Sequence, residues 1–448
     1  MSRLSPKIKT QIPGEKAKKI ITKDSRYASS SYIKEYPLVV DRGEGALVED
    51  VDGNRFLDLM AGIAVNITGY SHPRVVAAIK KQAEKFLHVC STDFYYSSFS
   101  NLVERLAKMT PLSGEKNVFL TNSGAEAIET AIKLARHHTR RPNIISFLGA
   151  FHGRTLGALS LTSSKALQRS FFGPFLPGIF HIPYGYCYRC PYNLKYGSCN
   201  IECADAIDHI LCRSLMNPEE IAAVFVEPIL GEGGYVVPPL EFHLKLREFT
   251  KNHGILLVVD EIQSGMGRTG KFLAIDNFGV EPDVVVLAKG LASGLPLGAV
   301  ISKKKYMGWK PGSHGSTFGG NPVSCEASLV TLDLIKKDLM ANASRTGAYF
   351  LKKLKTLEKT HPLIGDVRGM GLMIGIELVK NRKTKEPDFL AAPEIVKKAF
   401  KKGLLMLPCG ENVLRISPPL VINAEQVDVA IDIFQDTLSQ YEKEKGLL

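Results

Sequence analysis

The sequence predicts an α/β fold, with a mainly parallel sheet in a large domain and a smaller α+β domain built from both chain ends. Two observations predict it. Short β-branched runs alternate with helix-length segments between about residues 115 and 298, while the two chain ends carry turn-rich strands and helices without that alternation. A chain of 448 residues also suggests more than one structural unit. We therefore expect an N-terminal segment 1–70 that belongs to the small domain, a large domain 71–330 and a C-terminal part 331–448.

The strands of the large domain are near-continuous apolar runs. Such runs are typical of parallel strands that are buried on both faces of a sheet. They lie at residues 117–121, 143–147, 222–226, 255–259 and 284–288.

The chain ends predict different elements. Residues 37–60 look like hairpin strands with turns at Arg42-Gly43 and at Asp52-Gly53-Asn54. The C-terminal part has helical stretches around an alternating strand at 371–378 and a second strand near 413–417. Both ends thus supply strands and helices to the predicted small domain.

Charge and composition exclude several classes of protein. The net charge is +12, but the lysines fall in short groups at helix-like spacing without interleaved aromatic residues, which favours solvated helix faces over a nucleic-acid interface. No apolar run approaches the roughly 18 residues that a membrane span needs. The N-terminus is polar and lysine-rich, unlike a secretory signal. We expect a cytoplasmic protein without nucleic-acid or membrane partners.

A candidate phosphate site follows the first parallel strand. Ser123, Gly124 and Ala125 open a helical stretch, and Ser123 with Glu126 three residues later forms a predicted capping box. A helix N-terminus offers free N–H groups and a positive dipole end, and Gly124 lets the backbone approach an anion. Any capped helix of an α/β protein looks similar, so this pattern alone is weak.

A carboxylate and a lysine end two consecutive strands. Open α/β sheets bind ligands at the carboxyl ends of their strands, where Asp260 and Lys289 are expected. A desolvated lysine can form a Schiff base, and a carboxylate can keep a pyridine nitrogen protonated. A simple salt bridge between the two residues explains the pattern equally well.

The motifs around these residues resemble those of the class III aminotransferases, which are fold-type I enzymes that use pyridoxal 5′-phosphate (PLP). The resemblance rests on the stretch from Val259 to Gly270, on Ala288-Lys289-Gly290, and on motifs in order from Glu49 to Pro419. It implies that Lys289 forms a Schiff base with PLP and later moves the substrate proton. It also implies homodimers, or higher homo-oligomers, with shared active sites.

The resemblance implies roles for further residues of the cofactor site. Asp260 pairs with the pyridine nitrogen, Gln263 reaches the phenolic oxygen, and Phe151 stacks on the ring. The remaining implied contacts are phosphate binding by Ser123, Gly124 and Ala125, phosphate binding across the dimer by Ser316 and Thr317, and support of the ring site by His152 and Glu227.

Four positions bear on the substrate. By resemblance, Arg154 binds a substrate carboxylate, and Glu232 pairs with Arg415, which otherwise holds an α-carboxylate. Ile63 stands where 4-aminobutyrate enzymes have isoleucine and ornithine enzymes tend to have tyrosine. The predicted substrates are therefore an amino acid, with an ω-amino acid such as 4-aminobutyrate as one candidate, and an α-oxo acid such as 2-oxoglutarate.

Two other functions compete with aminotransfer. The family includes amino-acid racemases and epimerases, some of which have aspartate where this chain has Glu232, so the glutamate favours an aminotransferase. A PLP-binding regulator is disfavoured, because the set of Lys289, Asp260, Gln263 and Arg415 is complete and no segment for DNA binding is added.

Four of the eight cysteines form a separate pattern, Cys187-x2-Cys190-x8-Cys199-x3-Cys203, in a segment rich in Tyr, Pro and Gly. The spacing suits zinc or an iron–sulfur cluster, and some family members carry a cluster between subunits. Two disulfides, which the cytosol tolerates mainly in hyperthermophiles, or free thiols are equally compatible. The sequence alone therefore assigns no metal.

Overall fold

The computed structural model describes residues 5–447 and divides them into two compact units. One unit comprises the chain up to His72 together with the chain from Ala341 onward, and the other runs from Pro73 to Met340. The expected boundary at 330/331 lies inside helix α9 (Pro322–Leu334), which packs against helices of the second unit. The chain remains helical across the change of unit at 340/341, because α9 continues through a π-helical turn, Ile335–Leu339, into α10 (Met340–Thr360). The sequence therefore shows no loop or linker at this boundary.

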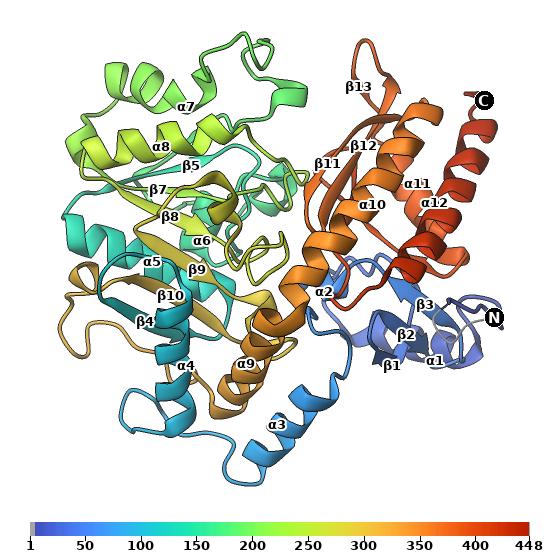
Figure 1. Ribbon diagram of the computed structural model, residues 1–448, viewed down its shortest axis with the longest axis horizontal. Helices are drawn as coiled ribbons and strands as arrows, with labels where there is room; N and C mark the ends of the chain where they lie inside the picture. Colours follow the sequence, from blue (N-terminus) through green and yellow to red (C-terminus); the bar gives the residue numbers. More distant parts are fainter. Residues whose placement is uncertain (1–4, 448) are drawn as a thin grey trace. The chain divides into compact units, whose positions relative to one another are not determined.

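The second unit contains a seven-stranded sheet in the order β4-β10-β9-β8-β7-β5-β6, all of it within the described residues (Figure 1). The strands β6, β5, β7, β8 and β9 are parallel neighbours, and β10 runs antiparallel to both β9 and β4. The five predicted strands are confirmed, and β6 and β10 are additional. The strand bounds are β4 Lys116–Thr121, β5 Asn143–Phe147, β6 Ile179–Ile182, β7 Ile221–Val226, β8 Leu256–Asp260, β9 Val284–Leu287 and β10 Gly298–Lys303.

Helices cover both faces of this sheet. All six residues of β7 are buried, as expected for a strand with helices on either side. Ala131 of α5 belongs to one apolar cluster with Phe225 of β7, whereas Phe242 of α8 packs edge-on against Phe147 of β5, with ring centroids 5.6 Å apart. The helices of the unit are α3 Pro73–Ala83, α4 Ser97–Met109, α5 Gly124–Thr139, α6 Leu156–Leu161, α7 Glu202–Ala206, α8 Leu240–Asn252 and α9.

The first unit joins the two chain ends in one sheet. Strand β14 from the C-terminal part pairs in parallel with β3 from the N-terminal part, which completes the order β1-β2-β3-β14. A second sheet has the order β11-β12-β16-β15, with β13 beside β12. The element bounds are α1 Glu15–Tyr27, β1 Val40–Glu44, β2 Leu47–Asp50, β3 Arg55–Asp58, α2 Ala61–Ala64, β11 Ile364–Met370, β12 Met373–Asn381, β13 Glu386–Pro387, α11 Ala391–Lys401, β14 Leu404–Leu405, β15 Leu407–Cys409, β16 Val413–Ile416 and α12 Ala424–Glu444.

One predicted turn of this unit is confirmed and one is wrong. The turn at Asp52-Gly53-Asn54 forms, and Gly53 has φ +84° there. Arg42 and Gly43 instead lie in β1, and the chain turns two residues later at Gly45, whose φ is +58°. None of the described helices has the length and the apolar character that a membrane crossing requires.

Candidate active site

The predicted site residues of the second unit gather at the carboxyl ends of its parallel strands. This is the edge where open α/β sheets bind ligands. Following the strands β4, β5, β7, β8 and β9 in turn, the chain places there Ser123, then Phe151 and His152, then Glu227, then Asp260 and finally Lys289.

Lys289 stands at the start of a short 3-10 turn directly after β9. Asp260 at the end of β8 lies opposite Val286 in the parallel register, and Lys289 follows three residues later. The lysine is half-buried, and its φ of +44° lies in the left-handed region. A non-glycine residue in that region is strained, and such strain concentrates at functional sites.

Asp260 is a buried carboxylate with only 3% of its surface exposed. Its Oδ2 atom lies 2.7 Å from Nδ1 of His152, and its Oδ1 atom accepts a hydrogen bond from the backbone N–H of Ile262 at 3.0 Å. Hydrogen bonds to both oxygens hold the carboxylate in place. Since each oxygen keeps a further lone pair, Asp260 can also accept a hydrogen bond from a ligand.

His152 lies behind Asp260 and is 2% exposed. Burial lowers the pKa of its ring, but the hydrogen bond to Asp260 and the charges of Asp260 and Glu227 outweigh burial and raise the pKa overall. Nδ1 carries a proton in the charged ring and in the neutral tautomer that suits an acidic neighbour, so it donates to Asp260 in both. We assign His152 to positioning Asp260.

Glu227 follows β7 and is 5% exposed. Its Oε1 atom accepts the backbone N–H of Phe151 at 2.9 Å, and its Oε2 atom accepts the backbone N–H of Gly231 at 2.9 Å. Burial raises the pKa of Glu227 to about 7, against the lowering effects of His152 and of the two N–H groups. One side chain thus fixes both the segment that presents Phe151 and the loop that leads to Glu232.

Replacing Glu227 with Gln should destabilise the protein by about 1–3 kcal/mol. Glutamine has one acceptor oxygen, so its NH₂ group must face one of the two buried N–H donors and leave that donor without a partner. Thermal unfolding at pH 6, where the raised pKa leaves Glu227 mostly protonated and neutral like glutamine, should show a melting temperature several degrees lower, whereas the exposed Glu219→Gln should leave it almost unchanged. An unchanged melting temperature in Glu227→Gln would show that the two hydrogen bonds contribute little.

Gln263 lies in the loop after β8 and is 8% exposed. Its Oε1 atom accepts a hydrogen bond from the hydroxyl of Tyr235 at 2.9 Å, which directs the amide NH₂ group to the other side. A Cβ atom added at Gly231 would lie 2.2 Å from Nε2 of Gln263. A side chain at this position would therefore displace the amide that the resemblance assigns to the cofactor.

The start of α5 differs from the predicted capping box. Ser123 is the N-cap and its Oγ accepts the N–H of Glu126 at 3.2 Å, but the Glu126 carboxylate accepts the N–H of Asn122 at 2.8 Å rather than that of Ser123. A Cβ atom at Gly124 would lie 2.8 Å from Ile262 Cδ1, so packing as well as anion approach explains this glycine. The first N–H groups of α5 have no intrahelical acceptor and suit a phosphate.

Ser316 lies near the candidate phosphate site of its own chain. Its Oγ accepts a hydrogen bond from Nδ2 of Asn122 at 3.2 Å and another from the N–H of Gly319 at 3.0 Å. Thr317 beside it is exposed. The predicted contact of this pair with a neighbouring subunit's phosphate stays a prediction.

The substrate residues of the second unit lie close to the same strand ends in the sequence. Arg154 is exposed, with its guanidinium carbon 6.0 Å from the centre of the Phe151 ring. Glu232 forms an ion pair with Lys165 at 3.0 Å, and the side chain of Glu232 is 17% exposed. The sequence analysis did not identify Lys165, because no motif marks it.

Ile63 and Arg415 belong to the first unit. Ile63 has φ +65° in a left-handed turn and is 42% exposed, an unusual conformation for a β-branched residue. Strain that holds an apolar side chain in solvent suggests that the side chain contacts a ligand. Arg415 lies on β16 and is 5% exposed.

Besides Lys165, two residues of the site were missed, Tyr235 and Asn122. His152 was assigned to the cofactor site, but its hydrogen bond to Asp260 was not predicted. Asn122 precedes a predicted N-cap, which is a usable signal. Tyr235, with φ +49°, acts through a fold-dependent contact that no local pattern reveals.

Comparisons with known proteins agree on one family and include relatives with two different activities. The chain matches the family model for "Aminotransferase class-III" over residues 28–438. It is similar to an alanine/serine racemase from Pyrococcus horikoshii, with 38% identity covering 97% of this chain and 94% of the relative. It is also 38% identical to a 4-aminobutyrate aminotransferase from Mycobacterium leprae, over 98% of this chain and 99% of that one. The solved structure of an (S)-enantioselective omega-transaminase from Thermomicrobium roseum superposes with a TM-score of 0.88 at 32% identity, covering 95% of this chain and 98% of that one.

Proposed function

Because the chain belongs to the class III aminotransferase family, we propose that it transfers an amino group from an amino acid to an α-oxo acid with PLP as cofactor. The observation that carries this proposal is the buried Asp260, held by His152 at the strand end next to the one that delivers Lys289. A buried carboxylate beside an amine on neighbouring strand ends is the donor set that a pyridine-aldehyde cofactor requires.

The residues present fit both ends of PLP, its ring nitrogen and its phosphate. Asp260 offers a buried carboxylate acceptor with a further lone pair for a protonated ring nitrogen. The N-terminus of α5, with Ser123 and Gly124, offers N–H groups and a positive dipole end for the phosphate. When bound, PLP supplies an electron sink for the negative charge that develops as the substrate carbon loses its proton.

Each protein residue has a defined task in this proposal. Lys289 takes the proton from the substrate carbon and returns it at the next step, as a positioned general base and acid. Asp260 keeps the ring nitrogen protonated, and His152 keeps Asp260 in place. Gln263 is oriented by Tyr235 so that its NH₂ group can donate to the phenolic oxygen.

The substrate end is proposed to use the two arginines for different carboxylates. Arg154 would hold the distal carboxylate of an ω-amino donor such as 4-aminobutyrate, and Arg415 the α-carboxylate of 2-oxoglutarate. Glu232 would pair with Arg415 when no α-carboxylate is bound, and Lys165 is one cation that pairs with Glu232 in the structure. Ile63 would contact the aliphatic part of the donor.

Replacing Arg415 with Ala should raise the KM for 2-oxoglutarate about 10- to 100-fold, because a charge-assisted hydrogen bond contributes roughly 1.5–3 kcal/mol. The KM for 4-aminobutyrate should change much less. Steady-state kinetics with each substrate varied in turn would measure both. Arg415→Lys keeps the charge without the planar fork and should recover only part of the loss. Equal effects on both substrates would contradict the division of labour between the arginines.

The proposed reaction is tested by following the nitrogen atom. The purified protein with PLP is incubated with ¹⁵N-labelled 4-aminobutyrate, or with labelled α-amino acids, together with 2-oxoglutarate. We expect ¹⁵N-glutamate to form in equal amount to the oxo product of the donor. Consumption of the donor without ¹⁵N label in glutamate would contradict the proposal.

A second candidate function is amino-acid racemisation. The similarity to the Pyrococcus horikoshii racemase is as extensive as that to the aminotransferase, so one specific observation favours it. Racemisation would use the same Lys289 and Asp260 but return the proton to the opposite face of the carbon. Racemisation needs no oxo-acid acceptor, whereas aminotransfer does, and this difference separates the two functions.

We further propose that the protein acts as a homodimer. Apolar side chains are exposed on two adjoining loops of the second unit, including Phe94 at 60% and Phe318 at 59%. The loops are joined by hydrogen bonds from Ser91 to the Gly319 carbonyl and from Asn321 to the Leu87 carbonyl. A clustered apolar surface suits a subunit interface. A cytoplasmic location remains part of the same proposal.

A further inference from the structure

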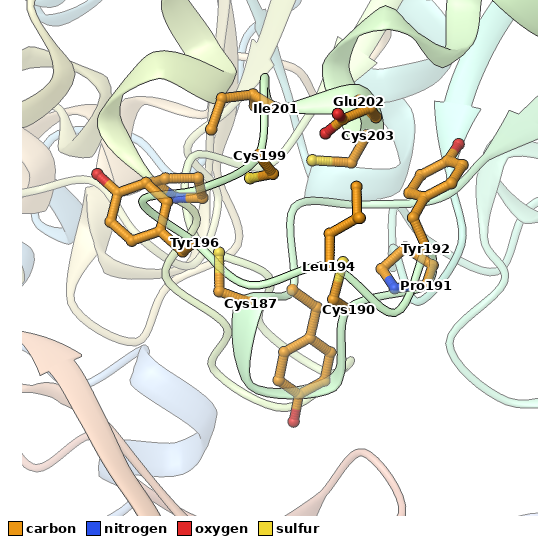
Figure 2. Close-up of a pocket in the computed structure, with 12 residues that line it drawn as sticks. Cys187, Cys190, Pro191, Tyr192, Leu194, Tyr196, Cys199, Ile201, Glu202 and Cys203 are labelled. Atoms are coloured by element: carbon orange, nitrogen blue, oxygen red, sulfur yellow. The ribbon is translucent and has the colours of Figure 1, made fainter.

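The four cysteines of the Cys187–Cys203 segment line one pocket in the second unit. Cys187 and Cys190 flank a 3-10 turn, and Cys199 and Cys203 flank the start of α7. Figure 2 shows all four side chains around a common space, so two separate turns place the four cysteines around one pocket. All four are free thiols in the structure.

We propose that these four cysteines bind a single zinc ion as a structural site. Thiolate sulfurs are soft ligands that select zinc or iron–sulfur clusters over magnesium or calcium. Closed sites with four cysteines, often with two of them in a Cys-x2-Cys turn, are typical of structural zinc. The pair Cys187 and Cys190 has that spacing, and Cys199 and Cys203 complete the set.

The pocket between the four cysteines has room for a single ion. Its cavity volume is about 20 Å³. One water-sized atom needs roughly 10–15 Å³ on this scale. The metal analysis described below distinguishes a single zinc ion from an iron–sulfur cluster.

Little apolar packing holds the cysteine segment in place. None of the residues 186–200 is fully buried, so this stretch has no apolar core of its own. Its backbone hydrogen bonds are short-range, such as Arg189 N–H to the Tyr186 carbonyl at 3.1 Å and Asn193 N–H to the Cys190 carbonyl at 3.0 Å. Segments without a core are commonly held by a metal or by disulfides.

The sulfur positions show what binding would change. Among the described residues, no three His, Cys, Asp or Glu side chains stand at the distances of a closed metal site. The cysteine side chains must therefore turn inward, and the single side-chain torsion of cysteine has three staggered positions for this. The pocket also contains the hydroxyl of Tyr192 and Oε2 of Glu202, which have no hydrogen-bond partner within the described part of the chain.

The zinc would fix a connection that reaches the active site. Tyr184, just before the cysteine segment, donates its hydroxyl proton to the carbonyls of Glu227 and Pro228 at 2.9 and 3.1 Å. Tyr196 within the segment hydrogen-bonds to Glu241 of α8 at 3.1 Å. The proposed zinc ion therefore has a structural role, and its loss should lower the stability of the protein before it affects the reaction.

Metal and thiol content of the purified protein test the proposal directly. Elemental analysis should find about one zinc per chain, as for a closed structural site. X-ray absorption at the zinc edge should show four sulfur atoms at about 2.3 Å. After denaturation with a chelator and no reductant, all eight cysteines should react with a thiol reagent. Three results overturn the proposal: no metal with four thiols blocked as disulfides, no metal with every thiol free, or iron with acid-labile sulfide.

Variants then locate the ion. Cys187→Ser and Cys199→Ser should each lose the zinc and lower the melting temperature by several degrees. Cys212→Ser is the matched control, because Cys212 is partly buried but lies outside the pocket, and it should keep the zinc. Full zinc content in both cluster variants would place the ion elsewhere and overturn the assignment. If a cluster variant does not fold, the metal content and sulfur coordination of the wild-type protein still decide.

Discussion

Replacing Lys289 with Ala is expected to lower kcat by about ten-thousandfold or more. General acid–base catalysis alone contributes roughly 10²- to 10⁴-fold, and the variant also loses the amine that attaches the cofactor. Borohydride should trap PLP on the wild-type protein at Lys289, and peptide mapping should find no label on the variant. Its fold should survive, since Lys289 is half-buried and alanine fits the same turn.

Lys303 provides a matched control for this experiment. It also ends a buried strand, but β10 is antiparallel, so Lys303 lies at the opposite edge of the sheet and pairs with Glu281 at 2.8 Å. Lys303→Ala should keep the covalent label and most of the activity. If borohydride still labels the Lys289 variant, the mapped lysine replaces Lys289 in the account.

Replacing Asp260 with Asn is expected to slow the reaction roughly a thousandfold, about 4 kcal/mol of barrier, while PLP still binds. The neutral amide cannot hold the ring nitrogen protonated, so the substrate carbon loses its electron sink. In this variant, either the oxygen or the NH₂ group of the new amide faces Nδ1 of His152. The primary deuterium isotope effect of the labelled donor should increase, because proton removal becomes rate-limiting.

The neighbouring Glu261 provides a control that distinguishes an effect on the reaction rate from an effect on stability. It is also fully buried, but its oxygens accept hydrogen bonds from Ile275 N–H at 2.8 Å and from Ser264 Oγ at 2.7 Å. Glu261→Gln should lower the melting temperature and leave the rate per folded molecule within a few-fold. An Asp260→Asn variant within a few-fold of wild type would reduce Asp260 to a structural carboxylate.

The sequence predicted the parallel strands well because their signal is local. A strand buried on both faces is apolar at every position, as in β7, and such runs need no knowledge of the neighbours. The proposed catalytic pair followed from the same logic, since Asp260 and Lys289 end two of these strands. What the sequence established was position along the chain, not the contacts between side chains.

The misses arise from contacts between distant residues. Strand β10 starts at Gly298, where an added Cβ would lie 2.3 Å from Thr121 Oγ1 on the neighbouring strand. Close packing between the two strands therefore explains this glycine, and no local pattern shows it. The turn predicted at Arg42-Gly43 fails for a similar reason, because pairing with β2 fixes the register and moves the turn to Gly45. His152 could not be linked to Asp260, since 108 residues separate them.

Simultaneous measurement of chirality and oxo-acid formation tests the central claim most directly. The protein with PLP is incubated with single L-amino acids and with 4-aminobutyrate, each with and without 2-oxoglutarate. Chiral chromatography follows the amino acid, and an oxo-acid assay follows the product. The proposal predicts an oxo product from the accepted donor in step with glutamate, sustained turnover only when 2-oxoglutarate is present, and retention of the L configuration. Appearance of the D-amino acid without an oxo acid and without an acceptor would contradict aminotransfer and establish racemisation instead.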